Sequence, residues 1–163
     1  MLKGIIDPAE CACCRLCCNF HQNSVWESPF IPQVQALRLE SEGVPVEMRQ
    51  RGGWSFAFHF EGGEAVNCPK LDVQTGCTMP PEEKPFECSV WPLRMMERNG
   101  KLVIGRYRDC PALTGDRLKQ LDRFAVGELR ETLLSFVSRY PESIRPFSPE
   151  YEVIWEGSLP ESD

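Results

Sequence analysis

The sequence lacks the features that mark several large classes of protein. Its 163 residues hold no apolar run near the roughly 18 residues of a membrane-spanning helix. Lys and Arg number 18 against 24 Asp and Glu, which gives a net charge of -6. Such a balance argues against a basic face for nucleic acid and against a polybasic membrane-binding surface. We therefore expect neither a membrane nor a nucleic-acid partner.

Signatures of common catalytic sites are also missing. No GxGxxG-type nucleotide loop, serine nucleophile motif or acid/base pair stands out, so no substrate or reaction follows from the sequence. Residues 1–8 have neither the apolar stretch nor the small-residue cleavage site of a signal peptide. We expect a cytoplasmic protein, whose thiols would be kept reduced.

Cysteine, in contrast, is abundant. The chain has 9 cysteines, and five of them fall between Cys11 and Cys18. A chain of this length can bury roughly 68–70% of its surface, so it does not need covalent staples to fold. An odd count also fits a complete disulfide set poorly. A lone cysteine often only fills a core, but clustering at this density is typical of metal ligands.

The N-terminal thiols form a CxxCxxCC pattern: Cys11, Cys14, Cys17 and Cys18. Cys13 is an extra thiol inside it. Thiolates separated by two residues can bind one metal while the backbone turns between them, and CxxCxxC has the spacing of a bacterial ferredoxin loop. The cysteine motif of bacterial ferredoxins ends with a cysteine that is followed by proline. In this chain both Cys68 and Cys110 are followed by proline.

Two local conformations would arrange the N-terminal thiols differently. A helix over residues 8–20 would place Cys11, Cys14 and Cys18 on one face. A loop would instead let Cys11, Cys14 and Cys17 wrap one cluster. In either case we expect the adjacent thiols of Cys17 and Cys18 to point well apart, toward different centres or opposite sides of one.

Four further cysteines are dispersed at long, unequal spacings that fit no small zinc-finger template: Cys68, Cys77, Cys88 and Cys110. Together with the four of the N-terminal pattern they predict one or two tetrathiolate centres. His21 and His59 could add imidazole ligands. With eight thiolates available, His59 is expected to be an ordinary strand residue instead.

This ordered set resembles the CxxCxxCC cysteine-cluster family, the YkgJ-type zinc- or iron-chelating domain. Beyond the N-terminal pattern the resemblance rests on segments 68–72, 76–77 and 84–93 and on Cys110, and it covers residues 7–111. Lys84 stands where an Arg is usual and Ser89 where a basic residue is usual. The resemblance implies a metal centre, an iron–sulfur cluster (4Fe-4S favoured) or zinc. Its eight implied ligands are Cys11, Cys14, Cys17, Cys18, Cys68, Cys77, Cys88 and Cys110.

Three functions are compatible with these residues. The first is a metal-binding protein whose iron–sulfur cluster or zinc serves redox or catalytic chemistry. The alternative is a non-enzymatic structural zinc module that mediates contact with a protein partner, because structural zinc sites are closed tetrahedra. The third is a metal-free thiol oxidoreductase with one cysteine of depressed pKa.

The expected fold is α+β: a small antiparallel sheet with helices, and cysteine-rich loops converging on a metal centre. The sheet is predicted from residues 54–68 and 93–107, packed against a helix over residues 114–140. Aromatic alternation predicts a strand over residues 54–60, and residues 61–64 are expected to turn the chain into a second short strand that ends near Cys68. Thr114 is expected to cap the helix, in which apolar residues from Leu118 to Tyr140 recur at spacings of three and four. Residues 1–140 are expected as a single metal-binding domain. Residues 141–163 are expected as an acidic, Pro-containing tail whose residues 151–155 can add an edge strand.

Local signals set the other expected boundaries. Asp7 and Pro8 predict the start of a helix. A second short helix is predicted within residues 31–43. Residues 68–88 are expected to be mostly loop. Asn99-Gly100 predicts a tight hairpin turn, and Gly127 predicts a kink or break in the C-terminal helix.

Overall fold

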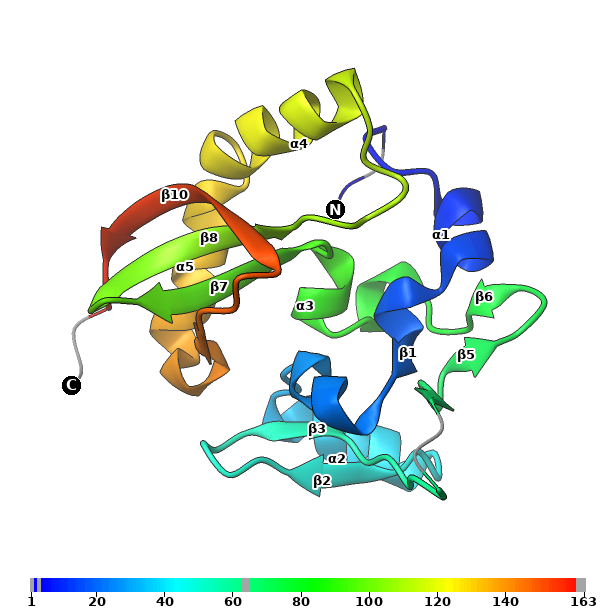
Figure 1. The fold of residues 1–163 in the computed structure, drawn as a ribbon. Coiled ribbons are helices and arrows are strands. Elements are labelled where there is room, and N and C mark those ends of the chain that lie inside the picture. Colours follow the sequence, from blue (N-terminus) through cyan, green and yellow to red (C-terminus); the bar gives the residue numbers. More distant parts are fainter. Residues whose placement is uncertain (1, 3, 63–64, 161–163) are drawn as a thin grey trace. The chain divides into compact units, whose positions relative to one another are not determined.

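The structure, a computed structural model, describes residues 2, 4–62 and 65–160. Its helices and short, mostly antiparallel strands confirm the α+β class (Figure 1). The described chain divides into two compact units, residues 7–89 and residues 2–6 with 90–160. In the sequence, the main segments of the two units meet at residue 89.

The first helix begins where the sequence predicts it. α1 spans Pro8–Cys14, and the carboxylate of Asp7 accepts a hydrogen bond from the N–H of Ala9 at 2.9 Å. The Glu10 carboxylate accepts the N–H of Asp7 at 3.4 Å, which completes a capping box. Arg15 ends the helix in the left-handed conformation, with φ 57°, so the helix does not continue to residue 20.

α2 and two short strands build the core of the first unit. α2 spans Gln33–Ser41, inside the predicted range, and β2 (Val46–Met48) pairs antiparallel with β3 (Trp54–Phe56). Buried apolar side chains of α2, β3 and the connecting segments form one cluster: Ile31, Ala36, Leu39, Val44, Phe56 and Met79. Half-buried Cys68 packs against this cluster, so one predicted ligand is attached directly to the hydrophobic core.

The hairpin predicted across residues 54–68 is wrong. β3 stops at residue 56, and the strand that ends just before Cys68, β4 (Val66–Asn67), pairs with β1 (Asn19–Phe20). Residues 63–64 of the predicted turn lie outside the described residues. Aromatic alternation indicates extended backbone but does not encode the partner strand, which is chosen here by contacts between distant segments.

The segment 68–88 contains more regular structure than the prediction of a loop allows. β5 (Leu71–Asp72) and β6 (Gly76–Cys77) form a small antiparallel hairpin. A 3₁₀ helix, Pro81–Glu83, and α3 (Phe86–Ser89) follow. The buried carboxylate of Glu87 accepts the N–H of Phe30 at 2.6 Å, which fixes the Cys88 segment to the rest of the unit.

The second unit is built on a four-stranded sheet of order β10-β8-β7-β9 (Figure 1). β7 (Leu93–Arg98) and β8 (Lys101–Tyr107) form the predicted hairpin, and Asn99 and Gly100 have the positive φ angles of its turn, 55° and 76°. β9 (Arg145–Pro146) runs parallel to β7. The predicted single sheet from 54–68 and 93–107 is thus wrong, since these segments belong to different units.

β10 (Tyr151–Ser158) pairs antiparallel along β8 at the edge of this sheet. The expected edge strand is therefore confirmed, and it runs beyond the predicted residues 151–155. Part of the expected tail is in this way an integral strand of the second unit.

The predicted C-terminal helix is two helices that meet at the expected glycine. α4 spans Asp116–Val126, α5 spans Arg130–Arg139, and Gly127 follows α4. Gly115 rather than Thr114 occupies the N-cap, without a side-chain cap. Their buried positions, which follow the predicted apolar spacing, are Leu121, Ala125, Leu129, Leu133 and Val137. Helical periodicity therefore identified the buried face correctly.

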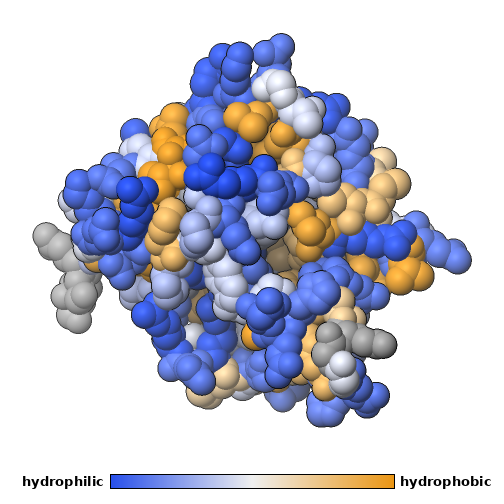
Figure 2. Space-filling model, viewed as in Figure 1, coloured by the Kyte–Doolittle hydropathy of each residue, from blue (hydrophilic) through white to orange (hydrophobic). Residues whose placement is uncertain are grey.

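Hydrophilic side chains predominate on the face drawn in Figure 2, with smaller hydrophobic groups between them. Among the described residues, no helix is long and apolar enough to cross a membrane. The large apolar side chains that remain exposed are Leu16, Val34, Leu37, Met48, Val73 and Leu159.

Candidate metal centre

The CxxCxxCC segment changes conformation at Arg15. Three of its cysteines lie on α1, whereas Cys17 and Cys18 lie in the 3₁₀ helix Leu16–Cys18, which leads directly into β1. The segment is thus neither the continuous helix nor the open loop considered from the sequence. The left-handed Arg15 and its side-chain bond to the carbonyl of Ala12, at 3.0 Å, form the junction.

The sulfurs of Cys17 and Cys18 lie 3.8 Å apart. The expectation that adjacent thiols point well apart is therefore wrong. It assumed the angular step of an α-helix or the alternation of a strand. A 3₁₀ turn that passes at once into extended backbone follows neither rule, and the two side chains converge.

Strand pairing brings Cys68 beside Cys18. β1 and β4 pair Asn19 with Asn67, and the next pair in the same register is Cys18 with Cys68. The N–H of Cys68 donates to the carbonyl of Cys18 at 2.7 Å. The side chains of Asn19 and Asn67 add a hydrogen bond of 2.9 Å. The first dispersed cysteine is thereby held against the N-terminal pattern.

The β5–β6 hairpin brings Cys77 to the same region. β6 contacts α1, and the two lie side by side in Figure 1. A Cβ placed on Gly76 would lie 2.8 Å from the Cβ of Ala12, so the absent side chain permits the close approach. The carboxylate of Asp72 accepts hydrogen bonds from the N–H groups of Gln74 and Thr75 and shapes the turn.

The thiol of Cys68 has a raised pKa. Burial, the largest cause, and like-charge repulsion from the nearby thiolates of Cys77 and Cys17 together raise this pKa from 9.0 to about 11. A hydrogen bond from the main-chain N–H of Lys70 to the sulfur acts in the opposite direction. This donor is the kind of group that orients a metal ligand, and no pattern in the sequence predicts it.

Cys17, Cys18, Cys68 and Cys77 are therefore gathered from three separate segments, and we name them the thiol cluster. Cys77 is exposed, as are the other predicted ligands of the first unit: Cys11 and Cys14 on α1 and Cys88 in α3. Cys110 is buried and belongs to the second unit. Cys13, the surplus thiol, is exposed on α1.

The side chains do not form a ready-made site. Among the described residues, no group of three or more His, Cys, Asp or Glu side chains is arranged to hold a metal ion. His21 and His59 are both exposed, and His59 follows β3 rather than lying within a strand. The backbone brings the cysteine segments together, and side-chain rotation would have to complete any coordination sphere.

Comparison of the chain with protein-family models, with curated proteins and with solved structures found no match. The resemblance to the cysteine-cluster family consequently stays a prediction carried by the spacing of the cysteines.

The raised pKa of Cys68 predicts that the metal-free protein loses stability at high pH. The folded chain holds this proton up to about pH 11 and the unfolded chain only to about 9.0, so the free energy of unfolding falls as the pH rises through this window. A window of about two pH units corresponds to about 3 kcal/mol. Denaturant unfolding of wild type and Cys68→Ser in excess reductant measures this loss of stability across the pH window. If the free energy of unfolding falls with pH equally steeply in both proteins, the prediction is wrong.

Proposed function

We propose that the first unit is a metal-binding module in which the thiol cluster holds one tetrahedral divalent ion, zinc being the best fit. The observation that carries the proposal is the convergence of Cys17, Cys18, Cys68 and Cys77 from three separate segments. Four thiolates are a complete ligand set for a structural zinc ion.

The spacing of the first two sulfurs supports a single ion. Zinc–sulfur bonds of about 2.3 Å in a tetrahedron place neighbouring sulfurs ~3.8 Å apart. Cys17 and Cys18 already have this separation, 3.8 Å. Cys17 and Cys77 lie near enough to Cys68 to raise its pKa by repulsion, and the N–H of Cys68 donates to the carbonyl of Cys18, so the four residues lie in one region.

Metal binding would complete a site that the protein holds only in part. Metal sites rarely exist preformed, and the thiols must lose their protons on binding. Cys68, whose pKa is about 11, would release nearly a full proton at neutral pH. Affinity is therefore expected to rise with pH, as metal competes with the proton on this sulfur.

The iron–sulfur cluster is the second candidate, and the exposed thiols of α1 favour it. Cys11 and Cys14 lie on α1 beside β6, with the CxxCxxC spacing of a ferredoxin loop. A cluster held by Cys11, Cys14 and Cys17 with one dispersed cysteine would use these thiols. The tetrahedral zinc site does not use them.

Metal and acid-labile sulfide analysis of protein purified without oxygen tests the proposal. One zinc per chain with no sulfide and no visible absorption supports the zinc module. About four iron and four sulfide per chain, with broad absorption near 400 nm, supports the cluster. A protein that takes up neither metal during anaerobic reconstitution would overturn both.

A further inference from the structure

Both the main-chain N–H and the carbonyl of Lys70 form hydrogen bonds beside the thiol cluster. Its N–H group hydrogen-bonds to the Cys68 sulfur. Its carbonyl accepts the N–H of Thr78 at 2.9 Å and the Thr78 hydroxyl at 3.0 Å. Lys70 thus connects the Cys68 sulfur with the residue that follows Cys77.

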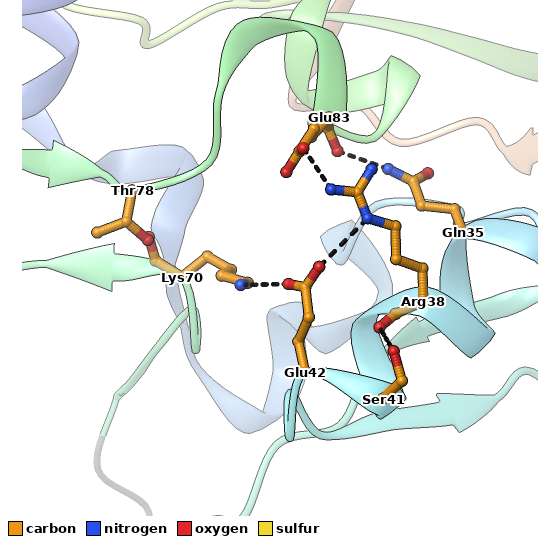
Figure 3. Close-up of polar contacts among 7 residues, drawn as sticks. All are labelled: Gln35, Arg38, Ser41, Glu42, Lys70, Thr78 and Glu83. Atoms are coloured by element: carbon orange, nitrogen blue, oxygen red, sulfur yellow. Dashed lines mark hydrogen bonds and ion pairs between the residues drawn. The ribbon is translucent and has the colours of Figure 1, made fainter.

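The side chain of Lys70 is fixed from the opposite direction by α2. Lys70 Nζ donates to Glu42 Oε2 at 3.1 Å, and Glu42 Oε1 accepts from Arg38 Nε at 3.2 Å (Figure 3). Only 22% of the Lys70 side chain is exposed, so the pair is less screened than an ordinary surface pair.

The same network reaches the segment that precedes Cys88. Arg38 forms an ion pair with Glu83, and Gln35 Nε2 donates to the carbonyl of Glu83 at 2.7 Å (Figure 3). α2 and Glu42, which directly follows it, therefore hold both the Lys70 and the Glu83 segments. We name these contacts the α2 clamp: Lys70 with Glu42, Glu42 with Arg38, and Glu83 with both Arg38 and Gln35.

We propose that Lys70 is the positioning residue of the thiol cluster and that Glu42 anchors it from α2. This inference rests on the proposed metal-binding function. An N–H bonded to a ligating sulfur sets the direction of the thiolate and stabilises its charge. The direction of the Lys70 N–H follows from the orientation of the peptide that carries it. The ion pair with Glu42 restrains the end of the Lys70 side chain.

The clamp matters more to the site than to the fold. Ion pairs with exposed groups contribute little to folding, and both Arg38 and Glu42 are substantially exposed. Outer groups that orient metal ligands, in contrast, typically change metal affinity about 10- to 100-fold when removed. A change in metal binding without loss of fold is therefore the signature of this role.

Co²⁺ titration of Lys70→Met, Glu42→Gln, the double variant and Lys70→Arg tests the inference, with the thiolate charge-transfer band as the signal. We expect both single variants to weaken Co²⁺ binding about tenfold and to change this band. The double variant should be no weaker than either single variant, because the two residues act through one contact. Lys70→Arg should restore most of the affinity.

Lys101→Met is the matched control, because it removes a lysine–glutamate pair of 2.6 Å with Glu156 in the second unit. It should bind Co²⁺ as wild type does. Wild-type affinity and an unchanged band in Lys70→Met and Glu42→Gln would overturn the positioning role.

A second readout needs no metal and separates the two proposals. In the metal-free protein, alkylation by iodoacetamide is followed site by site by mass spectrometry. Loosening the clamp should accelerate modification of half-buried Cys68 about fivefold relative to Cys77, with Cys110 unchanged. If wild type binds no Co²⁺, the metal-binding function fails. In that case a selective increase in the alkylation rate of Cys68 would still support the positioning role, and an unchanged rate would overturn it.

Discussion

Cys17→Ser or Cys68→Ser should weaken binding of a tetrahedral divalent ion about 100- to 1,000-fold. Structural zinc binds peptides with about 10–16 kcal/mol, and one of four thiolates represents about a quarter of that. Cys17 lies 3.8 Å from the sulfur of Cys18, and its charge acts on Cys68, so both residues are central to the thiol cluster. Competition of zinc between each variant and a chromophoric chelator measures the loss.

Cys13→Ser is the matched control. Cys13 lies in the same dense run of cysteines, but it is exposed on α1 and is the one thiol outside the recognised pattern. Its replacement should leave the metal content unchanged. Wild-type zinc affinity in Cys17→Ser would show that the thiol cluster is not the site.

Cys14→Ser distinguishes the two candidate metals. The zinc site assigns no role to Cys14, whereas the ferredoxin-like spacing makes it a ligand of the iron–sulfur cluster. Loss of metal in Cys14→Ser, with retention in Cys13→Ser, would favour the cluster. Retention in both, with loss in Cys17→Ser, would favour zinc.

Elements specified by neighbouring residues could be predicted from the sequence. The Asn99-Gly100 turn fixes the β7–β8 hairpin because both residues tolerate positive φ, and the strands pair as predicted. Asp7 and Glu10 fix the start of α1 by the same local logic. In each case the chemistry that decides the structure lies within a few residues.

Pairings between distant short strands could not be predicted. β1 and β4 are two residues each and carry little pattern, yet their register sets Cys68 opposite Cys18. The spacing of cysteines predicted a thiol-rich site but not which dispersed cysteine joins the N-terminal run. That choice depends on tertiary packing, which overrides weak local preference.

Gly76 is a further part of the site that cysteine spacing does not reveal. It is buried, has φ 88° and lies where β6 meets α1. An added Cβ would lie 2.8 Å from the Cβ of Ala12 and 3.0 Å from its Cα. The glycine is thus required twice, for its backbone conformation and for the approach of the helix that precedes Cys17.

Gly76→Ala should therefore destabilise the protein and weaken metal binding together. The left-handed conformation costs about 1–2 kcal/mol for a residue with a Cβ, and forcing a methyl into a packed contact costs about 1–3 kcal/mol. The sum predicts a loss of about 2–5 kcal/mol in the free energy of unfolding. Because the methyl moves α1 away from β6, we also expect about tenfold weaker zinc binding. Denaturant unfolding and chelator competition measure the two effects.

Gly100→Ala separates backbone strain from the contact. Gly100 also has a positive φ, 76°, but no atom lies within 4 Å of its added Cβ. It should lose stability through strain alone and bind zinc as wild type does. Adding Ala12→Gly to Gly76→Ala removes the nearest opposing atom, so zinc affinity should recover while the strain remains. Unchanged affinity in Gly76→Ala would show that the packing of α1 on β6 does not position the thiol cluster.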